Sequence, residues 1–426
     1  MHLSLEGSVR VRVVVAAVVV ASAIATSAVA APHGSFNPDA TAHTSALVAP
    51  AVNQGSRVSA VLASIQHTNP ATLPAYLAGN KQQILSALSG QGAAGRVGDW
   101  WSGLGQTQRR SIERSAPQLL GNLGGIPMTV RDTANQTMLR EQLDETSRMI
   151  RSAQGTASSK LTATLGGLRS IASALRAPAG EPKRTLTTFD TSGSMRAAIA
   201  IGDVDHADDV TILVPGMFYT VAGQMADWTH TAQVLYDAQR AWLKRLGQSS
   251  KTVATVAWLG YRTPDLMSVL SLTDAREGAT MLEEAVEGIR AARGTHQPYL
   301  SVVAHSYGST AALLAAQDAG TQLDALAVVG SPGSVATSVH ELNVPADRVF
   351  VGAALLDPIA GSGYFGTDPG SHDYGARPLG AVGGIDPIDG KVMLPAFGHN
   401  GYFAPGTESL RNLALIAIGD CSLVTR

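Results

Sequence analysis

The chain changes its hydrophobic period near residue 180. Before that point, apolar residues recur every three or four positions, most clearly in the stripe Leu161, Leu165, Leu168, Ile171 and Leu175. This spacing places the apolar side chains on one face of a helix, and residues 130–150 repeat it. Strand patterns are almost absent from this part of the sequence. We therefore expect residues 32–180 to form a helical N-terminal region.

Beyond a break at 177–183 that contains proline and glycine, short apolar runs appear, and all but one of them end in Gly, Pro or Asp. These runs lie at 196–203, 210–216, 252–260, 298–306, 324–333 and 347–358. Continuous apolar runs are typical of strands that are covered on both faces. Helical patterns lie between them at 232–246, 275–289 and 310–319. The alternation predicts a mostly parallel α/β sheet over 181–426, with its active site at the carboxyl ends of the strands.

The first 31 residues have the pattern of a secretory signal peptide. Arg10 and Arg12 precede an apolar stretch at 13–25, and the small residues at 28–30 fit a cleavage site. An uncleaved membrane anchor is the alternative, because the apolar run is almost long enough to span a bilayer. We favour cleavage, since no cluster of positive charges follows the run. The protein is therefore expected to be secreted or held in the cell envelope.

Composition excludes some classes of function. The formal net charge is −2 and no long basic run occurs, so we expect no nucleic-acid partner. Cys421 is the one cysteine of the sequence, so no internal disulfide can form. We expect it to be a small buried residue rather than a nucleophile or an intermolecular link. Sequence motifs for zinc or a dinucleotide are lacking, and we expect no cofactor.

The most informative short motif is A-H-S-Y-G, which centres on Ser306. It follows a run of β-forming residues and precedes a helical pattern, as in the G-x-S-x-G turn that exposes a nucleophilic serine. Ala304 and Gly308 supply the small side chains that such a strained turn requires on either side. The alternative is that Ser306 only caps the helix that follows.

A serine hydroxyl needs a base, usually a histidine that a carboxylate orients, and on this type of sheet the acid precedes the histidine in the chain. Asp357 ends the 347–358 run, so its carboxylate should emerge at the same sheet edge as Ser306. A solvated aspartate at a strand end is the alternative. The other acids downstream lie in loops with no strand to aim them: Asp368, Asp373, Asp386 and Asp389.

His399 is the preferred base, because it lies in a turn before the last amphipathic helix, from which it can reach the serine. His372, in the sequence PGSHDYG, is the second choice. His305 directly precedes the nucleophile, and consecutive strand residues point to opposite sides, so we do not expect it to act as the base.

Acyl transfer also needs donors for an oxyanion. The run at 210–216 ends in Pro-Gly, which leaves the backbone N–H of Met217 at the same edge, and the Tyr307 N–H is the second candidate. An ordinary turn at the end of a strand is the alternative. Trp100 and Trp101 are expected in the core, whereas Tyr261 with Arg262 and the segment 217–219 are candidates for lining a pocket.

Several stretches together resemble the signatures of an actinobacterial α/β-hydrolase family of largely unknown function: VTILVPGMFY, WLGYRTP, AHSYGST, VVGSPG, LDPIAG, GHNGYF and SLRNLA. The stretches WWSGLG and GNLGGIPMTVRDTANQ resemble the helical region that often precedes that domain. The resemblance implies an α/β-hydrolase fold with Ser306, Asp357 and His399 as its triad. Leu356, Asn400 and Gly401 replace an acid and serines that are common in the family, which leaves the substrate contacts open.

These observations lead us to expect an exported serine hydrolase that acts on a small-molecule or lipid carboxylic ester, in possible association with the cell envelope. An acyltransferase with the same triad is one alternative. A catalytically inactive binding module of the envelope is another. The sequence names neither the substrate nor the oligomeric state.

Overall fold

The computed structural model describes residues 54–90 and 92–426, so the predicted signal peptide lies outside the described residues. Val52–Arg426 form one compact unit. Its first part is helical, as predicted, and contains α1 (Gln54–His67), α2 (Leu73–Gly79), α3 (Lys81–Leu88), α4 (Ala93–Gly103), α5 (Gln106–Ser115), α6 (Pro117–Leu120), α7 (Met128–Ile150) and α8 (Gly155–Ala174).

The helices α1 to α6 enclose a core of their own, in which Val97, Trp101 and Leu120 are buried. Trp100 is partly buried against the same core, so both tryptophans pack as expected. The long helices α7 and α8 form a hairpin that packs against β1 (Arg184–Asp190) and α9 (Val221–Arg245).

The sheet confirms the predicted mostly parallel arrangement. Its order is β1-β2-β4-β3-β5-β6-β7-β8, in which β1, β2 and β4 pair antiparallel and every later pair is parallel. The remaining strands are β2 (Arg196–Ile201), β3 (Asp209–Val214), β4 (Val253–Leu259), β5 (Tyr299–His305), β6 (Ala325–Val329), β7 (Val349–Gly352) and β8 (Arg377–Pro378). A separate ribbon pairs β9 (Gly384–Ile385) with β10 (Val392–Met393).

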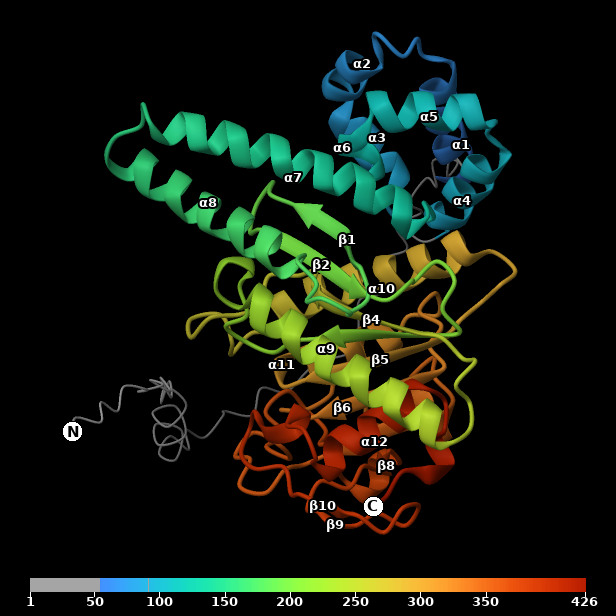
Figure 1. Cartoon of the computed structure of the whole chain (residues 1–426), viewed down its shortest axis with the longest axis vertical. Helices are drawn as coiled ribbons and strands as arrows, with labels where there is room; N and C mark the ends of the chain where they lie inside the picture. Colours follow the sequence, from blue (N-terminus) through green and yellow to red (C-terminus); the bar gives the residue numbers. More distant parts are fainter. Residues whose placement is uncertain (1–53, 91) are drawn as a thin grey trace, which may run out of the picture. The chain divides into compact units, whose positions relative to one another are not determined.

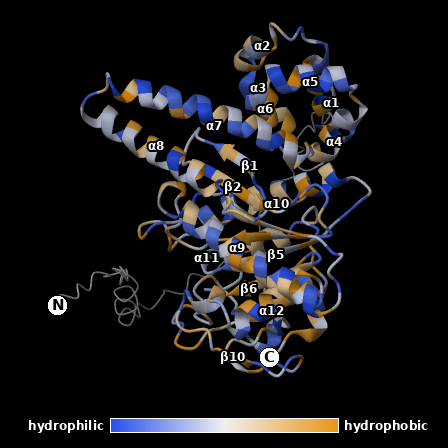
Figure 2. Ribbon diagram, viewed as in Figure 1, coloured by the Kyte–Doolittle hydropathy of each residue, from blue (hydrophilic) through white to orange (hydrophobic). Residues whose placement is uncertain are grey.

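Helices cover both faces of the sheet, which explains why its strands are apolar without alternation. The core on one face contains residues of α8, α9 and α12 (Glu408–Ala417), and the other contains residues of α10 (Thr273–Arg293) and α11 (Tyr307–Ala316). Along β2, Ile199 and Ile201 enter the first core, and Ala198 and Ala200 enter the second. Figure 2 shows the central strands mainly in hydrophobic colours.

Short 3₁₀ helices complete the fold: η1 (Val339–Glu341), η2 (Ala346–Arg348), η3 (His372–Tyr374), η4 (Gly401–Phe403) and η5 (Cys421–Leu423). Cys421 is buried, as expected. Among residues 54–90 and 92–426, none of the helices has the length and apolar character needed to cross a membrane.

The sequence prediction missed the edge strand β1 and the two-residue strands β8, β9 and β10, and it made β7 too long. The edge strand β1, with the polar sequence RTLTTFD, was not predicted, because it is not buried on both faces and therefore lacks a continuous apolar run. It pairs with β2 and packs against α7. In the run at 347–358, only Val349–Gly352 forms a strand. The chain then leaves the sheet, and the Leu355 N–H donates to the Ala396 carbonyl at 3.2 Å. The apolar segment that follows β7 therefore pairs with the loop that carries His399.

Side chains of the helical region bind the backbone of β1. The Asn122 amide donates to the Phe189 carbonyl and accepts from the Phe189 N–H, at 2.6 and 2.9 Å. The buried Asp132 carboxylate accepts from the Leu186 N–H at 2.8 Å. The helical part thus supplies hydrogen-bond partners for an edge strand that has only β2 beside it in the sheet. The boundary that we placed at residue 180 remains a prediction about domains.

Candidate active site

Ser306 lies at the sharp turn between β5 and α11. Its backbone has φ 56° and ψ −134°, a region that side-chain-bearing residues rarely adopt. The Ser306 N–H donates to the Val329 carbonyl at 3.0 Å, which holds the turn against β6. Ser306 therefore lies directly after the carboxyl end of a buried strand, in the kind of turn that exposes a serine hydroxyl.

Two glycines allow the chain to pass this turn closely. A Cβ atom on Gly308 would lie 2.2 Å from the Pro215 carbonyl oxygen, and one on Gly216 would lie 2.5 Å from the Ser306 Cβ. Both distances are shorter than any van der Waals contact. The Gly at the end of A-H-S-Y-G is therefore required because the start of α11 touches the end of β3.

The structure brings Ser306, His399 and Asp357 together. The Ser306 Oγ lies 2.7 Å from His399 Nε2, and His399 Nδ1 lies 2.9 and 3.0 Å from the two Asp357 carboxylate oxygens. With Nδ1–H donating to the carboxylate, the Nε2 lone pair is free to accept the serine proton. The Asp357 side chain is fully buried, so few competing waters can reach it.

Tyr402 completes this network from η4. Its hydroxyl donates to Asp357 Oδ2 at 2.5 Å and accepts from the Ala354 N–H at 2.9 Å. Burial alone would raise the pKa of Asp357, but the hydrogen bonds from His399 and Tyr402, the His399 charge and the Ile359 N–H outweigh it and lower that pKa to about 2. The carboxylate therefore stays ionised at all but strongly acidic pH.

Gly330, at the end of β6, provides space for this network. A Cβ there would lie 3.0 Å from Asp357 Oδ2 and 3.1 Å from both the His399 and the Tyr402 rings. Its φ is +62°, which glycine adopts at little cost. A larger residue at this position would press on all three side chains.

His305 holds the loop that carries the candidate base, His399. Its Nε2–H donates to the His399 backbone carbonyl at 2.7 Å, and the two imidazole rings lie 4.7 Å apart. Burial and the neighbouring His399 lower the pKa of His305 to about 4, so it is neutral near pH 7. Its Nδ1 is buried without a hydrogen-bond partner. His305 thus fixes the backbone of the loop that carries His399.

The predicted oxyanion donors lie on either side of Ser306. Tyr307 is the first residue of α11, where a helix leaves its N–H groups without intrahelical acceptors. Met217 follows Gly216, whose Cα lies against the Ser306 side chain. The Tyr261 hydroxyl donates to the Pro215 carbonyl at 2.8 Å and so fixes this loop. The oxyanion role of the two N–H groups remains a prediction.

Other residues singled out in the sequence lie elsewhere. The His372 side chain is fully exposed and contacts its neighbour Asp373. Tyr261 is buried and stacks on Trp258, so its side chain belongs to the core. Arg262 is about half exposed, with its Nε 4.0 Å from Asp274.

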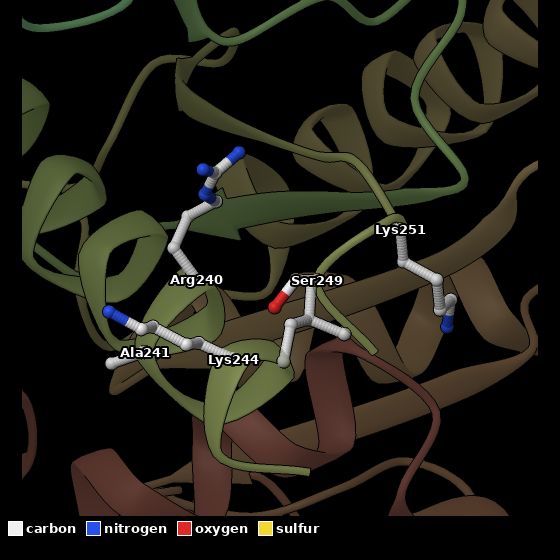
Figure 3. A pocket seen from close by; sticks show the side chains of 6 residues that line it. Arg240, Ala241, Lys244, Ser249 and Lys251 are labelled. Atoms are coloured by element: carbon white, nitrogen blue, oxygen red, sulfur yellow. The ribbon is translucent and has the colours of Figure 1, made fainter. Parts of the chain in front are cut away.

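A cavity of about 370 Å³ lies at the opposite edge of the sheet, beside the end of α9 and just before β4 (Figure 3). Its lining residues are Arg240, Ala241, Leu243, Lys244, Ser249 and Lys251. Lys251 already pairs with the buried Asp209 at 2.9 Å. Because this cavity adjoins the amino ends of the parallel strands, it is separate from the Ser306 site.

Sequence reasoning gave no role to Tyr402 or Gly330, and it proposed Tyr261 for the lining of a pocket rather than for its hydrogen bond to the Pro215 carbonyl. Tyr402 could have been noticed, since it follows His399 by three residues in GHNGYF. Gly330 and Tyr261 carried no such indication, because their partners are distant in the chain.

Comparison with known proteins identifies the family to which this chain belongs. Residues 190–367 match the model of a family described as alpha/beta hydrolase. The uncharacterized protein Mb0988c of Mycobacterium bovis is 30% identical over 217 residues, which cover 49% of this chain and 80% of that protein. The chain therefore belongs to the alpha/beta hydrolase family, as the sequence resemblance implied.

A longer relative is the uncharacterized protein Rv2079 of Mycobacterium tuberculosis, which is 27% identical over 382 residues. That match covers 76% of this chain and 56% of the relative, so this chain spans little more than half of its length.

Similar solved structures include XC6422 from Xanthomonas campestris, an α/β serine hydrolase, at 15% identity and a TM-score of 0.33, covering 57% of this chain and 97% of that one. Dienelactone hydrolase from Anabaena variabilis has 14% identity and a TM-score of 0.36, covering 58% and 100%.

Proposed function

We propose that the protein is a secreted serine hydrolase that cleaves carboxylic esters, with Ser306 as nucleophile, His399 as general base and Asp357 as the acid that orients it. The observation that carries this proposal is the unbroken series of hydrogen bonds from Ser306 through His399 and Asp357 to Tyr402. A serine made reactive in this way is the requirement for nucleophilic acyl transfer.

The first half of the reaction forms an acyl-enzyme. The Ser306 oxygen attacks the ester carbonyl carbon while its proton passes to His399 Nε2, and the carbonyl electron pair moves onto the oxyanion. Asp357 stabilises the imidazolium that forms. When the tetrahedral intermediate collapses, the carbon–oxygen bond to the alcohol breaks and the alcohol leaves with the proton from His399.

Water completes the cycle. His399 takes a proton from a water molecule whose oxygen attacks the acyl carbon, and a second tetrahedral intermediate forms. Its collapse breaks the bond to Ser306, which regains the proton from His399, and the carboxylic acid departs. In both halves, the Met217 and Tyr307 N–H groups would stabilise the oxyanion.

Tyr402 and His305 are positioning residues in this proposal. Tyr402 holds the Asp357 carboxylate through its hydroxyl, and His305 holds the His399 carbonyl. Preorganised hydrogen bonds of this kind preserve the nucleophile geometry without touching the substrate. The secreted location is supported by the N-terminal sequence pattern at 1–31.

Covalent labelling tests the proposal directly. A fluorophosphonate probe should label the wild-type protein, and Ser306→Ala should abolish both labelling and hydrolysis of p-nitrophenyl butyrate, with a fall in kcat of about 10⁴-fold or more. Ser371→Ala, which replaces a loop serine bonded to the Asp368 carbonyl, is the control and should label as the wild type does.

A folded wild-type protein that neither takes up the probe nor cleaves the ester would contradict the proposal and leave a binding module.

A further inference from the structure

Large apolar side chains are exposed in the loops that follow the carboxyl ends of the strands. Met267 is 91% exposed and Leu356 is 79% exposed, although side chains of this type are usually buried. We use the name apolar rim for the set Phe218, Leu266, Met267, Leu270, Leu356 and Phe397. Contiguous exposed apolar groups on a soluble protein mark an interaction surface.

Three residues of the apolar rim are close in sequence to residues of the candidate active site. Phe218 follows Met217, Leu356 precedes Asp357, and Phe397 lies two residues before His399. The rim residues are thus attached to the same loops as the reacting groups.

The loop at 261–272, which carries the other rim residues, is tied to the site by hydrogen bonds. The Phe218 N–H donates to the Pro264 carbonyl at 3.0 Å. Tyr307 follows Ser306 in the chain, and its hydroxyl donates to the Ser271 carbonyl at 2.5 Å and accepts from the Ala275 N–H at 3.0 Å. These hydrogen bonds therefore fix the position of the 261–272 loop relative to Phe218 and to the helix that follows Ser306.

These loops are also nearly free of charge. Apart from Asp357 and His399 themselves, no Asp, Glu, Lys, Arg or His occurs in the segments 215–220, 331–338, 353–366 and 395–407. The 261–272 loop adds Arg262 and Asp265, and the rest of the connection between β7 and β8 adds Asp368, His372 and Asp373. A protein surface that faces water normally carries charges of both signs. The composition of this edge is that of a surface which meets an apolar phase.

Backbone strain is concentrated in the same place. In the part of the chain that the structure describes, the non-glycine residues with positive φ are Phe218 at 64°, Ser306 at 56° and Leu356 at 57°. Such conformations cost free energy and persist where the surroundings impose them. Two rim residues thus share the unusual backbone of the nucleophile, and both present an apolar side chain to solvent.

We propose that the apolar rim docks the site onto a lipid assembly, and that the substrate is a long-chain carboxylic ester presented from that assembly. This inference rests on the proposed function. Because rim residues lie on the loops that carry Met217, Asp357 and His399, whatever covers the rim must also deliver the ester to Ser306. A lipid phase does both, whereas a protein partner seated on the rim would block the nucleophile. Apolar side chains inserted among acyl chains are the usual means of such docking.

Kinetics on two physical forms of substrate provide the first test. The double variant Leu266→Ser/Met267→Ser removes rim side chains, and Leu85→Ser/Met149→Ser removes side chains of similar type from the helical region, where they are 53% and 48% exposed. For each, kcat/KM is measured with dissolved p-nitrophenyl butyrate and with p-nitrophenyl palmitate in phosphatidylcholine vesicles. The rim variant should lower the palmitate-to-butyrate ratio about tenfold, because apolar burial in the vesicle is lost.

The control variant should leave this ratio at its wild-type value. An unchanged ratio in the rim variant, or an equal loss in the control variant, would overturn the proposal.

Vesicle binding provides a second test that needs no catalysis. Full-length Ser306→Ala is sedimented with phosphatidylcholine vesicles, with and without the rim substitutions, so that any contribution of the N-terminal segment is common to both. Binding that falls about tenfold with the rim substitutions supports the proposal. Binding that they leave unchanged overturns it.

The two proposals can fail separately. A protein that binds vesicles through the rim but cleaves no ester refutes the hydrolase. One that cleaves butyrate without binding vesicles refutes the lipid-facing rim.

Discussion

Apolar side chains are buried in the helical region but exposed in the loops at the carboxyl edge of the sheet. In the helical region, periodic spacing turns residues such as Leu168 and Ile171 inward until they are fully buried. At the loop edge, Met267 and Leu356 stay exposed and few charges accompany them. The difference indicates that the helical region follows the ordinary requirements of folding, whereas the edge departs from them beside the candidate active site.

The glycines of the two regions differ in the same sense. Gly166, in the middle of α8, has nothing within 4 Å of an added Cβ, whereas Gly308 would collide with Pro215. A small residue is optional in one place and obligatory in the other.

Gly308→Ala should therefore have the largest effect on folding. Because the new methyl group would lie 2.2 Å from a carbonyl oxygen, α11 or the end of β3 must shift, and we expect a loss of about 3 kcal/mol or more in the free energy of unfolding, with loss of ester hydrolysis. Gly166→Ala should raise the free energy of unfolding by about 1 kcal/mol, since alanine favours a helix. Urea unfolding of both variants measures the contrast, and equal shifts would contradict it.

His305 makes the stability of the site edge depend on pH. Its pKa falls from 6.5 to about 4 on folding, so the unfolded chain binds the proton more tightly. The resulting stability is complete above about pH 6.5 and is lost as the pH falls toward 4. This shift corresponds to about 3 kcal/mol between pH 7 and pH 4.

His305→Gln should flatten that dependence, because the glutamine side chain does not titrate in this range. Urea unfolding at pH 7 and pH 4 measures it. His372→Gln, at a fully exposed histidine, is the control and should follow the wild-type curve. If all the proteins lose stability in parallel, His305 is not the group responsible.

Tyr402→Phe should have a smaller effect on stability, together with a specific effect on the reaction. Loss of one hydrogen bond to a buried carboxylate should lower kcat about tenfold and change KM little, because Tyr402 acts through Asp357 and not on the substrate. The substitution also removes a bond that lowers the pKa of Asp357, so the acid-side loss of kcat should begin at a higher pH than in the wild type.

The matched control is Tyr374→Phe, which removes an equally buried hydroxyl, bonded to Ser334 at 3.0 Å. It should cost a similar amount of stability and leave the pH profile of kcat unchanged. Identical profiles for the two variants would show that Tyr402 is merely structural.

Local patterns were enough to predict much of the fold. The period of three to four in the first part and the apolar runs in the second gave the helices and the buried strands, because each depends on neighbours close in the chain. The edge strand β1 was missed, since its backbone is held by Asn122, in the turn between α6 and α7, and by Asp132 of α7, both distant in the chain. The turn at Ser306 could be foreseen because its small neighbours lie two residues away.

The sequence by itself determined the residue types of the candidate triad and the order in which they occur: a serine between small residues, then an aspartate, then a histidine. The tertiary structure decided how they meet. Asp357 lies beyond the end of β7 and reaches His399 because the two loops pair at Leu355, and Tyr402 contacts Asp357 across a space that Gly330 leaves open. No local sequence pattern indicates either contact, because each joins segments that are far apart in the chain and that only packing brings together.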